Sequence, residues 1–146
     1  MNPAVGAAIR EADAVIIGPG DLYTSLVPNV LVRGLPEALK KSKAKKIYVT
    51  NLMTKFGETN HFKASDFLAA MENYLGRGVL DYIVINNKQP SPMRFRPYAG
   101  EKSELVEADI EILAEKPTPI VADVLRGRGF IRHDPEKLAQ IIRMII

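Results

Sequence analysis

The chain has 146 residues, of which 47% are hydrophobic and 25% charged, with a net charge of +3. This is the profile of a single ordinary soluble domain with enough apolar material for a core, and it excludes a disordered chain. The small net charge does not favour nucleic-acid binding, which requires a dense basic face. Cysteine is absent, which excludes disulfides and thiolate ligands, and the two histidines lie too far apart in the sequence to predict a zinc site.

No apolar run approaches the roughly 20 residues that cross a bilayer. The amino terminus also lacks the basic-then-apolar order of a signal peptide. The sequence therefore predicts a cytoplasmic protein with no membrane partner, no nucleic-acid partner and no metal site.

The first predicted elements are a helix and a buried strand. Asn2 is suited to cap a helix that begins at Pro3. The apolar run AVII, residues 14–17, ends at glycines, as is typical of a strand covered on both faces. Two helical pieces follow, because Gly34 and Pro36 interrupt an apolar repeat of every fourth residue, which comprises Val27, Leu31, Leu35 and Leu39.

The rest of the chain continues to alternate strands with helices. We expect strands at residues 47–50, 82–86 and 120–124, and a half-exposed edge strand in the alternating pattern of residues 106–112. We expect one helix capped by Ser65 and stopped by Gly76, and a last helix that begins at Asp134 and Pro135. This order predicts an α/β fold, a Rossmann-like parallel sheet flanked by helices, in one domain spanning residues 1–146.

The loop after the first strand, residues 18–25, is the first candidate binding site. Gly18 and Gly20 would let backbone amides approach an anion, and the hydroxyls of Thr24 and Ser25 would add donors. The alternative is a tight strand-to-helix turn that uses glycine only for its geometry. Asp21 is either a metal ligand or a helix-capping acid.

A second polar loop, residues 51–59, follows the next strand. The carboxyl ends of parallel strands meet at one edge of a sheet, so this loop would face the same crevice as the first. Glu58 is either a magnesium ligand or base, or a helix cap. Near the last helix, Arg132 could reach a phosphate from the same edge, whereas Asp134 is expected only to cap. The candidates in this second loop are Asn51, Thr54, Gly57, Glu58 and Thr59.

Four strings in this order carry a family resemblance: ADAVIIGPGDLYTSLVPNVLV, AKKIYVTNLMTKFGET, KASDF and RHDPEKLA. Together they resemble the family that unites the 2-phospho-L-lactate transferases (CofD) with the YvcK-like gluconeogenesis factors, and the unbroken GPGDLYTS is more similar to the YvcK-like branch. The family begins with a glycine-rich nucleotide loop upstream of the residues matched here. The resemblance therefore implies the carboxyl-terminal half of such a fold, as an excised fragment or a truncated product.

For function, the resemblance implies binding of a nucleotide diphosphate or a UDP-sugar such as UDP-N-acetylglucosamine, in a regulatory protein tied to carbon metabolism, cell-wall synthesis and cell shape. No catalytic residue or cofactor is implied for that branch. The alternative is a phospholactyl transferase of coenzyme F420 biosynthesis, which would use a guanosine diphosphate carrier and Mg²⁺.

The same resemblance assigns contact with phosphate or sugar to residues of both loops. A missing first half would leave apolar surface uncovered, so we also expect a homo-oligomer. The assigned contacts in the first loop are Gly18, Pro19, Gly20, Tyr23, Thr24 and Ser25, and those in the second are the five candidates named above.

Overall fold

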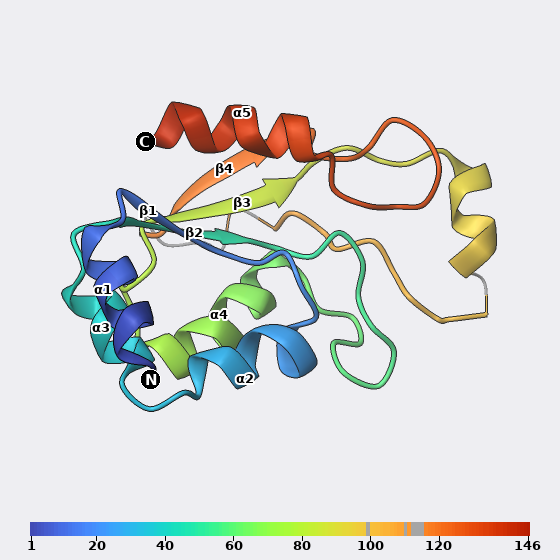
Figure 1. Cartoon of the computed structure of the whole chain (residues 1–146). Coiled ribbons are helices and arrows are strands. Elements are labelled where there is room, and N and C mark those ends of the chain that lie inside the picture. The colour runs from blue at the N-terminus through green and yellow to red at the C-terminus, as the bar shows by residue number, and fades with distance from the viewer. Residues whose placement is uncertain (99, 110, 112–115) are drawn as a thin grey trace.

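The structure, a computed structural model, describes residues 1–98, 100–109, 111 and 116–146. They form a four-stranded parallel sheet in the order β1-β2-β3-β4, with helices on both faces (Figure 1). The predicted α/β fold with a parallel sheet is confirmed. The strands are β1 (Ala14–Ile17), β2 (Lys45–Val49), β3 (Tyr82–Asn86) and β4 (Thr118–Ala122).

The helices divide between the two faces of the sheet. Figure 1 shows α5 (Pro135–Ile145) alone on one face. The other face is covered by α1 (Pro3–Glu11), α2 (Val27–Val30), α3 (Leu35–Lys41) and α4 (Ala64–Leu75). The described residues also form the π-helix η1 (Leu22–Leu26) and the 3-10 helix η2 (Pro92–Tyr98).

The alternation of side chains along the strands builds a separate core on each face. Tyr48 and Ile83 belong to the core under α1 to α4, whereas Ile47 and Val84 belong to the core under α5. All four are at most 1% exposed. Strands buried on both faces explain why the sequence shows continuous apolar runs here rather than a polar alternation.

Most predicted helix ends are confirmed by their capping contacts. The Asn2 side chain accepts a hydrogen bond from the Ala4 amide, and the Asp134 side chain accepts two from the first turn of α5. Gly76 ends α4 with a φ of 96°, a conformation that favours glycine.

Four sequence predictions need correction. Ser65 does not cap α4, because the helix begins at Ala64 with Lys63 as the N-cap, and the Ser65 hydroxyl donates instead to the Asp109 carboxylate. The second strand covers residues 45–49 rather than 47–50, and the last strand covers residues 118–122 rather than 120–124.

The predicted edge strand at 106–112 is absent from residues 106–109 and 111, and positions 110 and 112 lie outside the described residues. In its place, Val106 donates its amide to the Leu52 carbonyl, and the Glu107 carbonyl accepts from Ala64. The segment therefore fastens the loop after β2 to the start of α4. Asp109, which the alternating pattern would place outside, is only 5% exposed and accepts hydrogen bonds from Ser65.

Strand β1 lies at one edge of the sheet and pairs only with β2. Ile16, in this strand, is 48% exposed. Such an edge is compatible with self-association, which stays a prediction. None of the helices in the described ranges has the length and apolar composition needed to span a bilayer.

Candidate functional site

A cleft of about 580 Å³ lies where β1 and β2 end. This is the position at which open α/β sheets bind ligands, because the loops at the carboxyl ends of adjacent parallel strands meet there. Three chain segments form most of the lining, residues 19–21 after β1, 51–55 after β2 and 131–133 before α5. The remaining lining residues are Tyr98, Glu101 and Ser103.

The structure brings the first parts of both predicted loops together in this cleft. Pro19, Gly20 and Asp21 line it from the first loop, and Asn51 and Thr54 line it from the second. Thr54 is 4% exposed, and its hydroxyl oxygen accepts a hydrogen bond of 2.8 Å from the Glu104 amide. Its hydroxyl therefore also holds the cleft to the segment that follows η2.

Gly18 is part of the support of the cleft and is absent from its lining. Its φ is +88°, and a Cβ added there would lie 2.9 Å from the Val49 carbonyl oxygen. The position therefore requires glycine for backbone geometry and for the close approach of β2. The sequence allowed Gly18 to serve either an anion-binding loop or a tight turn, and the contacts of Gly18 are those of the tight turn.

The second part of the first loop does not line the cleft. Tyr23, Thr24 and Ser25 form most of η1, and all three side chains are exposed. The hydroxyls of Thr24 and Ser25, and for Tyr23 the family resemblance, predicted contacts with phosphate or sugar, but η1 begins after Asp21 and carries these side chains outside the lining.

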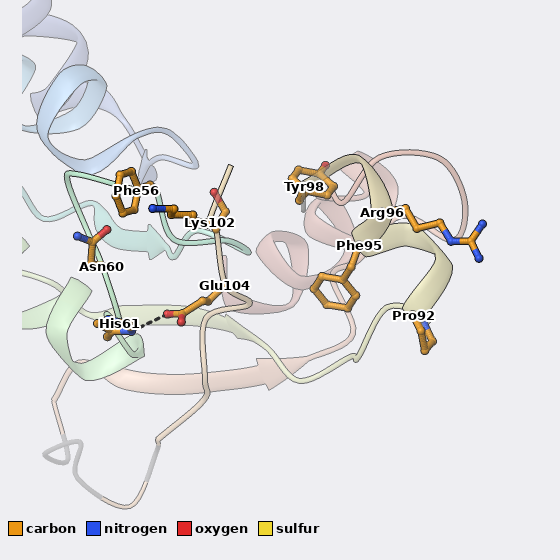
Figure 2. Close-up of a pocket in the computed structure, with 10 residues that line it drawn as sticks. Phe56, Asn60, His61, Pro92, Phe95, Arg96, Tyr98, Lys102 and Glu104 are labelled. Atoms are coloured by element: carbon orange, nitrogen blue, oxygen red, sulfur yellow. Dashed lines mark hydrogen bonds and ion pairs between the residues drawn. The ribbon is translucent and has the colours of Figure 1, made fainter. Parts of the chain in front are cut away.

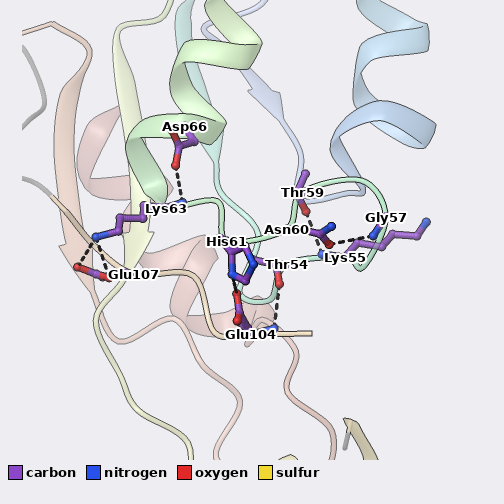
Figure 3. A network of polar contacts seen from close by, with 10 residues as sticks. All are labelled: Thr54, Lys55, Gly57, Thr59, Asn60, His61, Lys63, Asp66, Glu104 and Glu107. Carbon is purple, nitrogen blue, oxygen red and sulfur yellow. Dashed lines mark hydrogen bonds and ion pairs between the residues drawn. The ribbon is translucent and has the colours of Figure 1, made fainter. Parts of the chain in front are cut away.

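The second part of the other loop is a turn closed by its own polar contacts, as Figure 3 shows. Gly57 has a φ of +84° and donates its amide to the Asn60 side chain. Thr59 is 2% exposed, and its hydroxyl oxygen accepts from the Lys55 amide. Glu58 does not line the cleft, but it forms an ion pair with Lys55 at 2.8 Å. These residues position Lys55.

Lys55 is the main cleft residue that sequence reasoning missed. Its Nζ lies 2.7 Å from Asp21 Oδ2, so it joins the two predicted loops, and hydrogen bonds to Asp21 and Glu58 raise its pKa to about 12. The charge is therefore fixed at neutral pH, on a side chain that is 45% exposed. The available signal was its place in the second polar loop, between Thr54 and Glu58.

The third segment of the lining contributes Arg132 and His133. Arg132 is exposed and adds a second cation to the cleft, at the place considered from the sequence for a phosphate contact. His133 Nε2 lies 3.1 Å from the Thr50 carbonyl oxygen, and burial lowers the pKa of the ring to about 4. His133 was not selected from the sequence, because its neighbour Asp134 explained the motif as a helix cap.

A second pocket, of about 670 Å³, adjoins the cleft and shares Tyr98 and Ser103 with it. Figure 2 shows its aromatic side chains, including Phe56 and Phe95. The Lys102 ammonium lies 4.8 Å from the centre of the Phe56 ring. Much of this pocket comes from residues 92–104, where prolines made the sequence pattern irregular.

Oxygen and nitrogen ligands in the cleft do not assemble into an evident metal centre. Within the described ranges, no group of three or more His, Asp or Glu side chains is placed to hold a metal ion. Asp21 and Glu101 are the carboxylates that line the cleft, and Asp21 is already paired with Lys55.

Comparison with known proteins identifies gluconeogenesis factors as relatives of this chain. The chain is 47% identical to a putative gluconeogenesis factor of Thermotoga maritima over 98% of its length, which is 47% of that protein. It is 40% identical to a gluconeogenesis factor of Bacillus subtilis, covering 92% of this chain and 43% of the relative. The chain thus spans about half the length of these curated relatives.

A solved structure has the same fold. A crystal structure of a UPF0052 family protein from Bacillus halodurans superposes with a TM-score of 0.90 at 38% identity, covering 98% of this chain and 46% of the other. The family model described as 2-phospho-L-lactate transferase CofD matches residues 1–125. The resemblance found in the sequence motifs is therefore confirmed, and the chain belongs to the CofD family, with gluconeogenesis factors among its relatives.

Proposed function

We propose that this chain binds the diphosphate of a nucleotide or UDP-sugar in the cleft beyond β1 and β2, as part of a regulatory protein of the gluconeogenesis-factor type. The carrying observation is that two cations from distant segments, Lys55 and Arg132, line one cleft together with Gly20. Cationic side chains suit a diphosphate, and so does a glycine, whose missing Cβ lets the backbone approach the phosphates closely. The assignment to carbon metabolism, cell-wall synthesis and cell shape belongs to the same proposal and rests on the family resemblance.

In this proposal the Lys55 ammonium exchanges partners. It is held at 2.7 Å from Asp21 and 2.8 Å from Glu58, so two carboxylates keep it at the edge of the cleft before a ligand arrives. Because the side chain is 45% exposed, releasing one surface carboxylate for a phosphate costs little. Arg132 would bind the same anion through its planar guanidinium.

Amide NMR spectra of the labelled chain, recorded with UDP-N-acetylglucosamine and Mg²⁺, test this proposal. We expect shifts concentrated in residues 19–21, 51–55 and 131–133. Lys55→Met should weaken binding about tenfold or more, because a charge-assisted hydrogen bond is lost. Lys63→Met is the matched control, since Lys63 is also ion-paired and also 45% exposed but lies outside the cleft. Equal losses in both variants, or shifts outside the cleft, would contradict the proposal.

The name of the matching family model favours one alternative, a phospholactyl transferase. Mg²⁺ would then neutralise the diphosphate of the guanosine carrier, and the oxygen donors available to it in the cleft are those of Asp21 and Glu101. Turnover of a guanosine diphosphate carrier with a deazaflavin alcohol and Mg²⁺ would establish this activity. Binding of the UDP-sugar without such turnover would favour the regulatory function.

A further inference from the structure

The cleft also contains uncharged hydrogen-bond acceptors, which a diphosphate does not use. The Asn51 side-chain oxygen Oδ1 is buried and has no hydrogen-bond partner among the described residues. Buried polar atoms are normally paired, because removing them from water without a partner costs free energy. Since Asn51 lines the cleft, this oxygen is a candidate contact for a bound molecule.

His133 supplies a second acceptor, and its tautomer follows from its partner. The Thr50 carbonyl can only accept, so the hydrogen bond of 3.1 Å requires a proton on His133 Nε2. Burial lowers the pKa of this ring to about 4, so the ring is uncharged at neutral pH. In a neutral imidazole with a protonated Nε2, Nδ1 carries a lone pair and accepts hydrogen bonds.

Both acceptor residues line the same cleft and are tied to Thr50. Asn51 directly follows Thr50, whose carbonyl receives the His133 ring. His133 is itself fixed by an antiparallel bridge to Leu125, and the Asp134 amide donates to the Val124 carbonyl. The orientation of the ring is therefore set before any ligand binds.

We propose that Asn51 Oδ1 and His133 Nδ1 accept hydrogen bonds from neutral donors of the ligand, its hydroxyl or amide N–H groups, and so select the nucleoside or sugar part. This inference rests on the proposed diphosphate binding. Phosphate oxygens offer lone pairs and would be repelled by both acceptors, whereas Lys55 and Arg132 attract them. The cleft would thus orient a UDP-sugar, with phosphates on the cations and donors on Asn51 and His133.

Two ligands separate this role from simple anion binding. Calorimetric titrations would compare UDP-N-acetylglucosamine with inorganic diphosphate, for the full chain and for Asn51→Leu and His133→Gln. The glutamine amide nitrogen can still donate to the Thr50 carbonyl, but glutamine has no acceptor atom bonded to Cγ, the position of Nδ1 in histidine. Met53→Leu is the control, because Met53 lines the same cleft and has no strong acceptor. We expect each test variant to lose about tenfold in affinity for the UDP-sugar and less than twofold for diphosphate.

A spectroscopic measurement on the unmodified chain is independent of any folding defect in the variants. In nitrogen-15 spectra of the imidazole, the UDP-sugar should shift His133 Nδ1 to lower frequency, while diphosphate leaves it unchanged. Unaltered UDP-sugar affinity in both variants, or equal losses of affinity for both ligands, would overturn the inference. Neither result would overturn the proposed function, because the unmodified chain would still bind diphosphate. Failure of the unmodified chain to bind either ligand would overturn the proposed function and, with it, this inference.

Discussion

The two walls of the cleft differ in how their polar groups are balanced. The charged wall consists of Asp21 and Lys55, which form an ion pair while 44% and 45% exposed. The neutral wall consists of Asn51 and His133, where burial keeps the imidazole uncharged and the Thr50 carbonyl accepts from its ring. Asn51 and Lys55 belong to the same loop after β2, so the difference between the walls arises from burial rather than from position along the sheet.

This difference assigns separate tasks to the walls. An exposed ion pair is weak and is screened by salt, so it can be replaced by a ligand anion at little cost. Buried uncharged groups keep one geometry, because any group left unpaired there costs free energy. We therefore expect the charged wall to control affinity for phosphate and the neutral wall to control which molecule carries it.

The largest effect is expected from Gly18→Ala, which disrupts the backbone between the walls. The added Cβ would lie 2.9 Å from the Val49 carbonyl oxygen at a φ of +88°. Strain and overlap together should cost about 3 kcal/mol of unfolding free energy, measured in urea. Gly20→Ala is the control. A Cβ added at Gly20 would lie 3.2 Å from the flexible Leu26 side chain, and the φ of Gly20 is not in the positive range. Equal stability of both variants would show that β1 and β2 do not depend on this close approach.

The next effect concerns acid stability of the neutral wall. An unfolded histidine titrates near its ordinary pKa of 6.5, whereas His133 in the fold has a pKa of about 4. Above pH 6.5 both states are neutral and His133 adds no pH dependence. Between pH 6.5 and 4 the unfolded state binds the extra proton, so the fold loses about 3 kcal/mol across this window.

His133→Gln should remove this acid-dependent loss. Unfolding free energies of variant and parent, measured from pH 7 to pH 4, would show this loss as a difference between the two proteins, in which contributions common to both cancel. His61→Gln is the control, since the His61 side chain is 84% exposed and outside the cleft. A difference as large for His61→Gln as for His133→Gln would contradict the interpretation that burial keeps His133 uncharged.

A smaller effect is expected from Asp21→Asn, which tests whether Asp21 competes with a ligand anion for Lys55. Removing the carboxylate frees Lys55 from one competitor, so affinity for the UDP-sugar without Mg²⁺ should rise about threefold. The measurement is a titration of parent and variant at low salt. If Asp21 instead holds Mg²⁺, the variant would bind more weakly when Mg²⁺ is present, and this reversal would favour the transferase alternative.

Much of the fold could be predicted because burial leaves a local signature. Apolar runs located all four strands of the sheet to within two residues, and Asn2 and Asp134 identified helix starts through short-range caps. The sequence pattern at 106–112 misled the prediction because Val106 and Glu107 bond to Leu52 and Ala64, far away in the sequence, instead of to a neighbouring strand. A local alternation of apolar and acidic residues does not show which distant groups they will meet, and Asp109 is buried against Ser65.

The cleft was predictable only in part for the same reason. Parallel strands bring their loop ends together, so Gly20 and Asn51 were placed correctly near one another. Lys55 was missed because its value lies in the ion pair with Asp21, which exists only after folding. His133 was missed because its neutral state depends on burial and on the Thr50 carbonyl, neither of which its sequence neighbours reveal.

The smallest effect is expected from Thr24→Ala and Ser25→Ala. From the sequence, the hydroxyls of these two residues were predicted to donate hydrogen bonds to a phosphate. Both residues lie in η1, both are exposed, and neither lines the cleft. Each variant should therefore change affinity for the UDP-sugar less than twofold, measured beside Lys55→Met as the sensitive reference. A tenfold loss at Thr24 would show that the ligand extends past Asp21 onto η1, and the charged wall would then have to include the start of that helix.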